Sequence, residues 1–381
     1  MSVDLRNVHR CFRCGWCKLP STFIDYNCPS YVRFHFESYS PGGRLWLIRA
    51  WLKKELRWSD RLAEILFSCV GCRNCSENCK MRFKDEVTDW IIAAKSVAIE
   101  EGLAPPKVRE FLENIAKFGN PWGLPRSQRA TWISGVKKYE GDEYLLYLGC
   151  ESSYLEAGRK VARNVIEVLE AAGISFGILG NEEECDGNEA YMLGEMGLFQ
   201  ELAFKNMKLF QELGVKKVLT ISPHAYNAMK KYPARSFEVI HFTQLLYELV
   251  KEGKFRFSRM ECKVTYHDPC FLGRYNGIYL EPRKILLSIP GLKLVEMKRT
   301  RENSFCCGGG SGNFVFDLLH GMESPARVRV REALETGAKV LAIACPICRC
   351  MLEDAIKDEG LEEEFEVKDV AEMILDSMKS R

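Results

Sequence analysis

The stretch that decides most of the fold is KVTYHDPC (263–270), in which a short apolar strand pattern leads directly into a cysteine. After 35 intervening residues comes a cysteine pair in FCCGGGSG (305–312), and after 37 more comes CPIC (345–348). These three stretches bring five cysteines to the points where we expect three strands to end. The carboxyl ends of strands are where open α/β sheets place their sites.

A sparser copy of this pattern lies 120 to 123 residues earlier, at Cys150, Cys185 and SPHA (222–225). A fixed offset between matching features indicates an internal repeat. In the first copy, Asp186 stands where the second cysteine of the pair belongs, and SPHA lacks both cysteines of CPIC. The sequence therefore predicts a duplicated unit whose second copy alone is intact. His224 and Asp186 are conceivable metal ligands, but a scaffold that has lost its site is the favoured interpretation.

Short strand patterns alternate with helical ones from residue 141 to the end, which favours α/β layers with parallel sheets. We expect strands at 144–149, 173–179, 217–222, 238–242, 263–268, 292–297 and 339–345. We expect helices at 155–171, 189–212, 279–287 and 325–335. The predicted domains are the degenerate repeat, 141–260, and the intact repeat, 261–381. The acidic tail EEEFEVKD (362–369) is interpreted as a solvated face.

Residues 1–140 instead show apolar spacing of three to four, which predicts helices, and a linker rich in Pro, Gly and Trp (119–142) closes this part. Within it, CVGCRNCSENCK (69–80) has the C-x2-C-x2-C-x3-C spacing of two-cluster ferredoxins, in which the fourth cysteine serves the other cluster. CFRCGWC (11–17) supplies a second triplet, and Cys28 follows as a displaced fourth cysteine. Crossed ligation predicts one cubane [4Fe–4S] cluster on Cys11, Cys14, Cys17 and Cys79, and another on Cys69, Cys72, Cys75 and Cys28. The expected fold is an α+β multidomain protein with a helical ferredoxin-like domain ahead of the repeats.

Zinc is the alternative for the N-terminal cysteines, although zinc sites use two pairs of ligands and these cysteines form triplets. In the intact repeat, Cys270, Cys306, Cys307, Cys345 and Cys348 make one thiol more than a cubane cluster needs. A redox-active Cys345–Cys348 disulfide is the competing interpretation there. The GGGSG segment lacks the Lys-Ser/Thr of a phosphate loop. Cys262 and Cys350 lie outside the repeat pattern and are interpreted as bystander thiols.

The cysteine count, the net charge and the absence of long apolar runs limit the functions that the chain can have. The chain has 381 residues, 17 cysteines and a net charge of +2, with no apolar run long enough to span a membrane and no secretion signal at its start. These features favour reduced thiols in the cytoplasm that bind metal, and they argue against a disulfide framework. The near-neutral charge gives no case for nucleic acid as a partner.

With these motifs assembled, the chain resembles the HdrD family of heterodisulfide reductase subunits, in which a ferredoxin block is fused to CCG domains. The resemblance extends to DsrK-like proteins and to iron–sulfur subunits of glycolate and lactate oxidases. It implies a non-cubane [4Fe–4S] cluster on the five C-terminal cysteines, at which a disulfide is cleaved. The degenerate first repeat departs from true HdrD and leaves a single non-cubane site, as in DsrK-like proteins.

Two functions follow from this resemblance. In the first, the protein is an iron–sulfur oxidoreductase subunit that passes electrons through two cubane clusters to or from the non-cubane site, where a disulfide or heterodisulfide is reduced or formed. His267 could supply a proton to the leaving thiolate, although a strand-end histidine bonded to the backbone is the plainer interpretation. In the second, the protein is a non-catalytic electron-transfer subunit linking a flavoprotein to a quinone-reducing membrane partner.

The absence of a flavin or nicotinamide fingerprint implies that the redox partner is another protein. Expected partners are a flavoprotein or a cytochrome b-type membrane subunit, with a disulfide, a thiol or a small sulfur-carrier protein as substrate. The expected location is the cytoplasm, either free or held at the inner face of the membrane by a partner subunit.

Overall fold

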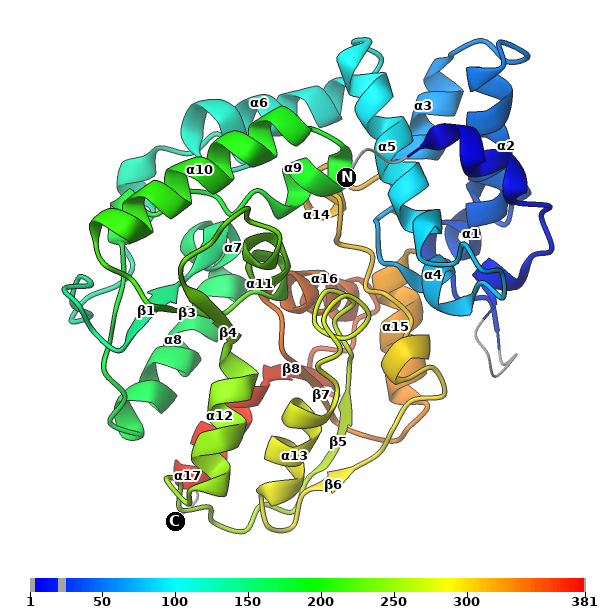
Figure 1. The fold of residues 1–381 in the computed structure, drawn as a ribbon. Coiled ribbons are helices and arrows are strands. Elements are labelled where there is room, and N and C mark those ends of the chain that lie inside the picture. The colour runs from blue at the N-terminus through cyan, green and yellow to red at the C-terminus, as the bar shows by residue number, and fades with distance from the viewer. Residues whose placement is uncertain (1–3, 20–24, 380–381) are drawn as a thin grey trace.

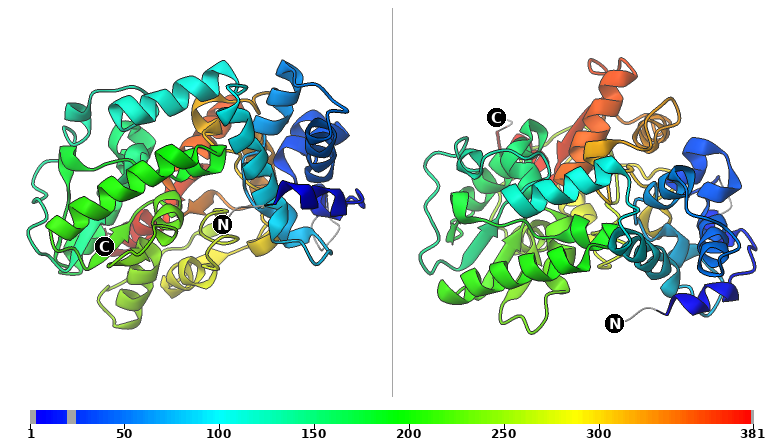
Figure 2. Two further views of the ribbon diagram at one scale, coloured as in Figure 1. Left: turned by 45° about the horizontal axis from the view of Figure 1, so that its top comes forward. Right: turned by 90° about the horizontal axis from the view of Figure 1, so that it is seen from above.

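The computed structural model of the chain describes residues 4–19 and 25–379. Its N-terminal part is helical; helices α1 to α5 gather at one end of the molecule, and α6 runs beside α10 (Met196–Glu212) of the first repeat (Figures 1 and 2). The α-helices of this part are α1 (Pro29–Phe34), α2 (Pro41–Leu52), α3 (Asp60–Phe67), α4 (Asn74–Asn78), α5 (Glu86–Glu100) and α6 (Pro106–Phe118). Short 3₁₀ helices lie at η1 (Leu5–Arg10), η2 (Trp16–Lys18), η3 (Glu37–Tyr39) and η4 (Arg126–Gln128).

Serine caps set the starts of two N-terminal helices. The Ser40 hydroxyl accepts a hydrogen bond from the Gly43 N–H at 3.0 Å at the start of α2, and the Ser59 hydroxyl accepts from the Leu62 N–H at 3.2 Å at the start of α3. A serine in this position satisfies a backbone donor that the helix itself leaves unpaired. The chain therefore ends one helix and begins another inside a continuous run of apolar spacing.

The two repeats form two parallel four-stranded sheets with the same strand order, β2-β1-β3-β4 and β6-β5-β7-β8. The strands are β1 (Tyr144–Tyr147), β2 (Phe176–Gly177), β3 (Lys217–Thr220), β4 (Glu238–His241), β5 (Lys263–Tyr266), β6 (Lys293–Leu294), β7 (Val340–Ile343) and β8 (Glu366–Asp369). The central strands β1 and β7 are buried along their whole length, as expected for sheets covered on both faces. This topology confirms the duplicated α/β unit.

Helices cover both sheets. Those of the first repeat are α7 (Gly149–Tyr154), α8 (Glu156–Ala171), α9 (Asn188–Leu193), α10 (Met196–Glu212), α11 (Pro223–Lys230) and α12 (Phe242–Lys251), with η5 at Gly180–Glu182. Those of the second are α13 (Leu280–Ser288), α14 (Asn313–Phe316), α15 (Pro325–Leu334), α16 (Pro346–Asp358) and α17 (Val370–Lys379), with η6 at Arg301–Asn303. The repeats meet where α8 packs on α16 and α17, and where α12 packs on α13.

The single helix expected over 189–212 is wrong, because the structure divides it into α9 and α10 at Gly194. Gly194 has a φ of +91°, and a Cβ built there would lie 2.4 Å from the backbone nitrogen of Ser96 on α5. The break lets the first repeat touch a helix of the N-terminal part.

The solvated face expected at 362–369 is also wrong in part. Residues Glu366–Asp369 form β8, and Phe365, Val367 and Asp369 are buried. Only alternate residues of this short edge strand face inward. The charged residues of the segment make it look like an exposed polar stretch, so the strand is hard to recognise from sequence. None of the described helices combines the length and apolar character needed to cross a membrane.

Candidate functional site

Two N-terminal loops turn three cysteines each toward a small cavity. The residues on either side of the middle cysteine have φ values of +57° and +86° in CFRCGWC (11–17), and +64° and +62° in CVGCRNC (69–75). Left-handed backbone is uncommon outside glycine, and both loops use one arginine and one glycine to adopt it. The matching pattern gives both triplets the same wrapped conformation.

A fourth cysteine from outside each triplet completes each set. One cavity is lined by Cys11, Cys14, Cys17 and Cys79. The other is lined by Cys28, Cys69, Cys72 and Cys75. These are the groups that the crossed pairing predicts, and their ligation of clusters stays a prediction. The first set is nearer the surface because its Cys14 is exposed, whereas Cys28, Cys72 and Cys75 of the second set are buried.

Hydroxyl groups accompany the second set. The Cys28 Sγ lies 3.6 Å from the Ser30 hydroxyl, and the Cys75 Sγ lies 3.4 Å from the Thr88 hydroxyl. Burial raises the pKa of both thiols, and each hydroxyl contact opposes that shift. Hydroxyl donors near cluster sulfur are among the features by which proteins set the potential of a cluster.

The third group of thiols lies in the second repeat, with every member 7% exposed or less: Cys270, Cys306, Cys307, Cys345 and Cys348. Cys270 lies in the loop that follows β5, and Cys345 caps the N-terminus of α16. The Sγ atoms of Cys270 and Cys306 are 3.9 Å apart, and those of Cys307 and Cys348 are 3.4 Å apart. The expectation of three strand ends is wrong in one respect, because the adjacent pair of cysteines follows η6 rather than a strand.

Glycine is required for a structural reason at each of the three positions after the cysteine pair. Gly308 has a φ of +88°. A Cβ on Gly309 would lie 2.5 Å from the Ile347 side chain, and one on Gly310 would lie 2.4 Å from the carbonyl oxygen of Val70. Positive φ is needed at the first position only, and close approach excludes a side chain at the other two. Gly310 therefore holds the C-terminal thiol loop directly against the second N-terminal cysteine loop.

The second and third thiol groups are in direct contact. The thiol of Cys72 lies beside that of Cys306, and this neighbour together with burial raises the pKa of Cys72 well above its ordinary value. Arg274 fixes the junction, because its Nε donates to the Cys72 carbonyl at 2.7 Å and its Nη1 donates to the Ser304 carbonyl at 2.7 Å. The two groups are thus joined through a single thiol pair.

A buried lysine joins all three parts of the chain beside this junction. The Lys95 Nζ, on α5, donates to the Cys69 carbonyl at 2.7 Å, the Met192 carbonyl at 3.5 Å and the Ser311 hydroxyl at 3.4 Å. Its burial lowers the pKa of the ammonium group to about 8. One side chain therefore ties the N-terminal cysteine loop, the first repeat and the glycine loop together.

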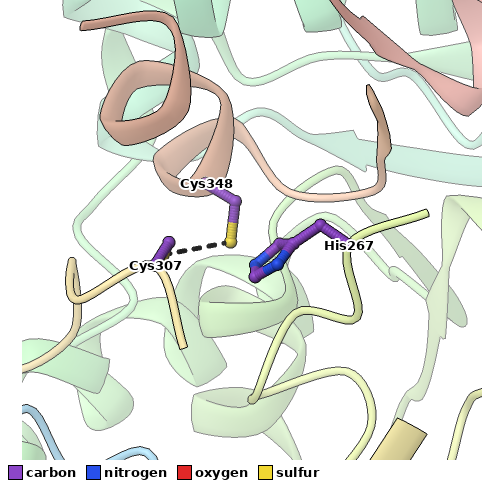
Figure 3. Close-up of side chains that lie close together, drawn as sticks. All are labelled: His267, Cys307 and Cys348. Atoms are coloured by element: carbon purple, nitrogen blue, oxygen red, sulfur yellow. Dashed lines mark hydrogen bonds between the residues drawn. The ribbon is translucent and has the colours of Figure 1, made fainter. Parts of the chain in front are cut away.

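His267 points its free nitrogen at the third thiol group. Arg329, itself fully buried and paired with Glu332 at 2.9 Å, donates from Nε to the His267 Nδ1 at 3.1 Å. Nδ1 is therefore an acceptor, so the proton lies on Nε2, which has no hydrogen-bond partner. A ring nitrogen of His267 and the sulfur atoms of Cys307 and Cys348 lie within 4.8 Å of one another (Figure 3). The side chain thus bonds to arginine and not to the backbone, which favours a role at the thiols.

The position of the lost site in the first repeat is filled by an arginine from the linker. The Arg129 guanidinium lies 3.7 and 3.8 Å from the Cys150 Sγ and pairs with Glu183 at 2.7 Å, and the side chains of both charged residues are 2% exposed or less. Glu183 also accepts the Leu148 and Gly149 N–H groups at 2.9 Å. Sequence reasoning treated residues 119–142 as a linker and missed this contact, for which no local pattern gives a signal.

His224 and Asp186 do not form a metal site with the remaining cysteines of the first repeat. Among the described residues, three potential metal ligands have their ligand atoms within 4.8 Å of one another, and these are His267, Cys307 and Cys348 of the second repeat. Asp186 instead accepts the Asn188 N–H at 2.7 Å, as aspartate does in tight turns. His224 contacts Glu189 and the Cys345 thiol of the second repeat.

These donor sets fit iron–sulfur clusters. Two sets of four thiols surround cavities, and thiolates are the ligands that cubane clusters use. Zinc takes four ligands in its structural sites, fewer than the five buried thiols of the third group. The number of donors therefore favours a cluster over zinc at the third group.

Comparisons with known proteins agree with this arrangement. Residues 144–230 and 264–353 match the cysteine-rich CCG domain, and residues 7–83 match the 4Fe-4S dicluster domain. The chain is 39% identical over 331 residues to the probable iron-sulfur-binding oxidoreductase FadF of Bacillus subtilis, covering 83% of this chain and 47% of that protein. It is 31% identical over 433 residues to the EtfAB:quinone oxidoreductase of Syntrophomonas wolfei, covering 99% of this chain and 59% of that protein. The chain thus spans about half the length of these two relatives.

A third relative matches along nearly its whole length. The HdrD subunit of the dihydromethanophenazine:CoB–CoM heterodisulfide reductase of Methanosarcina acetivorans is 30% identical over 406 residues, covering 99% of this chain and 95% of that protein. The resemblance expected from the cysteine motifs is therefore confirmed. The chain belongs to the family of iron–sulfur oxidoreductases that includes the HdrD subunit of heterodisulfide reductase.

Proposed function

We propose that this oxidoreductase subunit passes electrons between two cubane clusters and a non-cubane [4Fe–4S] cluster at which a disulfide or heterodisulfide is reduced or formed. The first cubane is held by Cys11, Cys14, Cys17 and Cys79. The second is held by Cys28, Cys69, Cys72 and Cys75. The non-cubane cluster is held by Cys270, Cys306, Cys307, Cys345 and Cys348.

The contact between Cys72 and Cys306 is the observation that carries this proposal. It joins a thiol of the second set to a thiol of the third, and the first set, with its exposed Cys14, lies nearest the surface. The order from outside to inside is therefore first cubane, second cubane, substrate site. Electrons from a protein partner are expected to arrive at the Cys14 end.

The chain's own residues stabilise the negative charge that forms on a leaving sulfur. Reduction of RSSR′ consumes two electrons and two protons and gives RSH and R′SH, and both protons come from water. When bound, the clusters supply electrons one at a time and an iron that a substrate sulfur can approach. Arg329 keeps His267 in the tautomer whose Nε2 carries the proton and faces Cys307 and Cys348. His267 is thereby placed to donate a hydrogen bond from Nε2 to one leaving thiolate, and it keeps its own proton because Nδ1 is already occupied by Arg329.

A disulfide-reduction assay tests the proposal. Anaerobically purified protein, reduced through viologen dye, is given the CoB–CoM heterodisulfide and, separately, a small symmetric disulfide, and thiols are counted. We expect two thiols per disulfide consumed, loss of this activity in Cys307→Ser, and retention of activity in the matched control Cys262→Ser. Cys262 lies outside the three thiol groups, beside the start of β5. Equal activity in both variants would overturn the assignment of the third group.

The alternative function is electron transfer without disulfide turnover, between a flavoprotein or electron-transferring flavoprotein and a quinone-reducing, cytochrome b-type membrane partner. The near-complete burial of the five C-terminal cysteines favours it, as does the relationship to a protein named EtfAB:quinone oxidoreductase. Such a chain would work in the cytoplasm or against the inner membrane face through its partner. Reduction of all centres by a reduced flavoprotein, with no thiol released from either disulfide, would select this alternative.

A further inference from the structure

The degenerate first repeat contributes a side chain to the thiol site of the second repeat. His224 belongs to SPHA, which replaces CPIC in the first copy. Its imidazole is 4% exposed and packs on the ring of Phe271, with 4.3 Å between ring centroids. Phe271 directly follows Cys270, so the histidine lies across the boundary between the repeats.

A carboxylate fixes the orientation of this imidazole. The His224 Nδ1 donates to the Glu189 Oε1 at 2.6 Å, and the Asn188 amide donates to the same carboxylate oxygen at 2.8 Å. The other oxygen of Glu189 accepts the Gly312 N–H at 2.6 Å. Gly312 belongs to the glycine-rich loop of the second repeat. Glu189 is therefore held from both repeats, and it cannot turn away without losing bonds to each of them.

The second nitrogen of the ring is directed at a cysteine. His224 lies beside the Cys345 side chain, and because Nδ1 is taken by Glu189, Nε2 is the nitrogen left to face that sulfur. Burial alone would lower the pKa of His224, but the charge of Glu189 and the neighbouring Cys345 thiol raise it well above its ordinary value. The arrangement is a carboxylate, a histidine and a sulfur in series.

We propose that His224 is a positioning residue that donates a hydrogen bond from Nε2 to the Cys345 sulfur and thereby raises the reduction potential of the C-terminal cluster. This inference rests on the proposed function. A hydrogen bond to a ligating sulfur stabilises the additional negative charge of the reduced cluster, and Glu189 orients the donor as carboxylates orient histidines beside metal centres. The first repeat lacks both cysteines of CPIC and keeps, in the same segment, a donor that serves the site of its neighbour.

Potentiometry followed by EPR, with iron counted in the same samples, tests this role on the full chain. His224→Leu removes the donor, and His224→Gln keeps an N–H on a side chain of similar reach. His241→Gln is the matched control, because His241 is a fully buried histidine of the same repeat whose ring bonds to Thr243 at 2.8 Å. We expect full iron content in all variants and a lower potential for the C-terminal centre in His224→Leu. His224→Gln should lie closer to the unmodified protein, and His241→Gln should match it.

The possible failures are distinguishable. A normal iron content with an unchanged C-terminal potential in His224→Leu would overturn the role of His224 alone. Loss of the C-terminal centre in both His224→Leu and His224→Gln would also overturn it, because the residue would then be needed to hold the cluster. A third centre missing from the unmodified protein would overturn the proposed function itself. The two N-terminal centres serve as internal references in every sample.

Discussion

His267 owes its tautomer to a neighbour that lies 62 residues away in sequence. Arg329 has no exposed surface, and its other nitrogens are occupied by Glu332, the Arg299 carbonyl and the Ser304 hydroxyl. The guanidinium is therefore fixed and always charged, so it always donates to Nδ1. The sequence indicated His267 from its place in HDPC, but it could not indicate the arginine that orients it.

Replacing His267 with leucine is expected to slow disulfide reduction by about 10² to 10³-fold, the range typical of a lost hydrogen-bond donor to a developing negative charge. The iron content should not change, because the thiols remain in place. Stopped-flow reduction at fixed pH measures the rate, and His320→Leu is the control because His320 bonds to its own loop at the surface. A His267→Leu rate within twofold of normal would leave this side chain with a packing role only.

His241 makes the stability of the fold depend on pH. Burial lowers its pKa to about 3, whereas an unfolded chain has the ordinary value of 6.5. Below pH 6.5 the unfolded state therefore binds a proton that the folded state does not, so stability falls as the pH drops toward 3. The loss approaches about 1.4 kcal/mol per pH unit for this one group.

We expect the thermal midpoint of His241→Gln to fall less steeply between pH 6.5 and 5 than that of the unmodified protein. Differential scanning calorimetry of both proteins in the same buffers isolates the contribution of the histidine. Parallel curves would contradict the buried, neutral state of His241.

Among the elements, the glycine loop before α14 determines how closely two thiol groups approach. Gly310 lies against the Val70 carbonyl, and an added methyl group would meet that oxygen at 2.4 Å. Neither backbone can move away freely, because Arg274 and Lys95 bind both loops. At Gly310, the loop therefore has room for backbone atoms only, and no side chain fits between it and the Val70 carbonyl.

Gly310→Ala should destabilise the protein by about 1–3 kcal/mol, the cost of overpacking, and should slow electron transfer to the C-terminal centre. Gly197→Ala is the control. Gly197 lies in α10, where a Cβ meets only the flexible Glu195 side chain at 3.3 Å, and alanine there is expected to stabilise by about 0.5–1 kcal/mol. Thermal midpoints and freeze-quench EPR measure the two effects. Equal behaviour of the two variants would show that the close contact has no consequence.

Elements with a clear period were predictable, and those determined by packing were not. The repeat offset predicted a duplicated α/β unit, and the two parallel sheets of matching strand order confirm it. Gly194 lies inside the stretch predicted as one helix over 189–212, and the break there depends on Ser96, which lies about a hundred residues away. Likewise, β8 is recognisable from the burial of Val367 and Asp369 but not from an acidic segment. The domain boundaries near 140 and 260 stay predictions.

For the whole molecule, the thiol groups could be predicted from sequence, but their mutual contacts could not. Spacing alone indicated which cysteines group together. Packing between the three parts of the chain determines the contact of Cys72 with Cys306 and the position of His224. The spacing of cysteines in the sequence carries no information about this packing. The segment interpreted as a linker supplies Arg129, which contacts Cys150 and Glu183 in the first repeat.

Lys95 tests whether the three parts act as one unit. Lys95→Met keeps most of the side-chain volume but leaves the Cys69 and Met192 carbonyls without their donor. We expect a loss of about 1–3 kcal/mol in stability for a buried acceptor left unpaired. The exposed Lys205→Met, which breaks only an ion pair with Glu201 on the same helix, should change little. Thermal unfolding of both variants measures the difference in stability, and equal midpoints would show that Lys95 does not hold the three parts together.

We propose that one chain holds three iron–sulfur centres close together. The most direct test is the iron, sulfide and zinc content of anaerobically purified protein, with EPR spectra of the oxidised and reduced states for the unmodified chain and for Cys307→Ser. We expect about 12 iron per chain, no zinc, and loss of one unusual centre in the variant. About 8 iron with free or disulfide-bonded C-terminal thiols, or zinc in place of iron, would contradict this proposal.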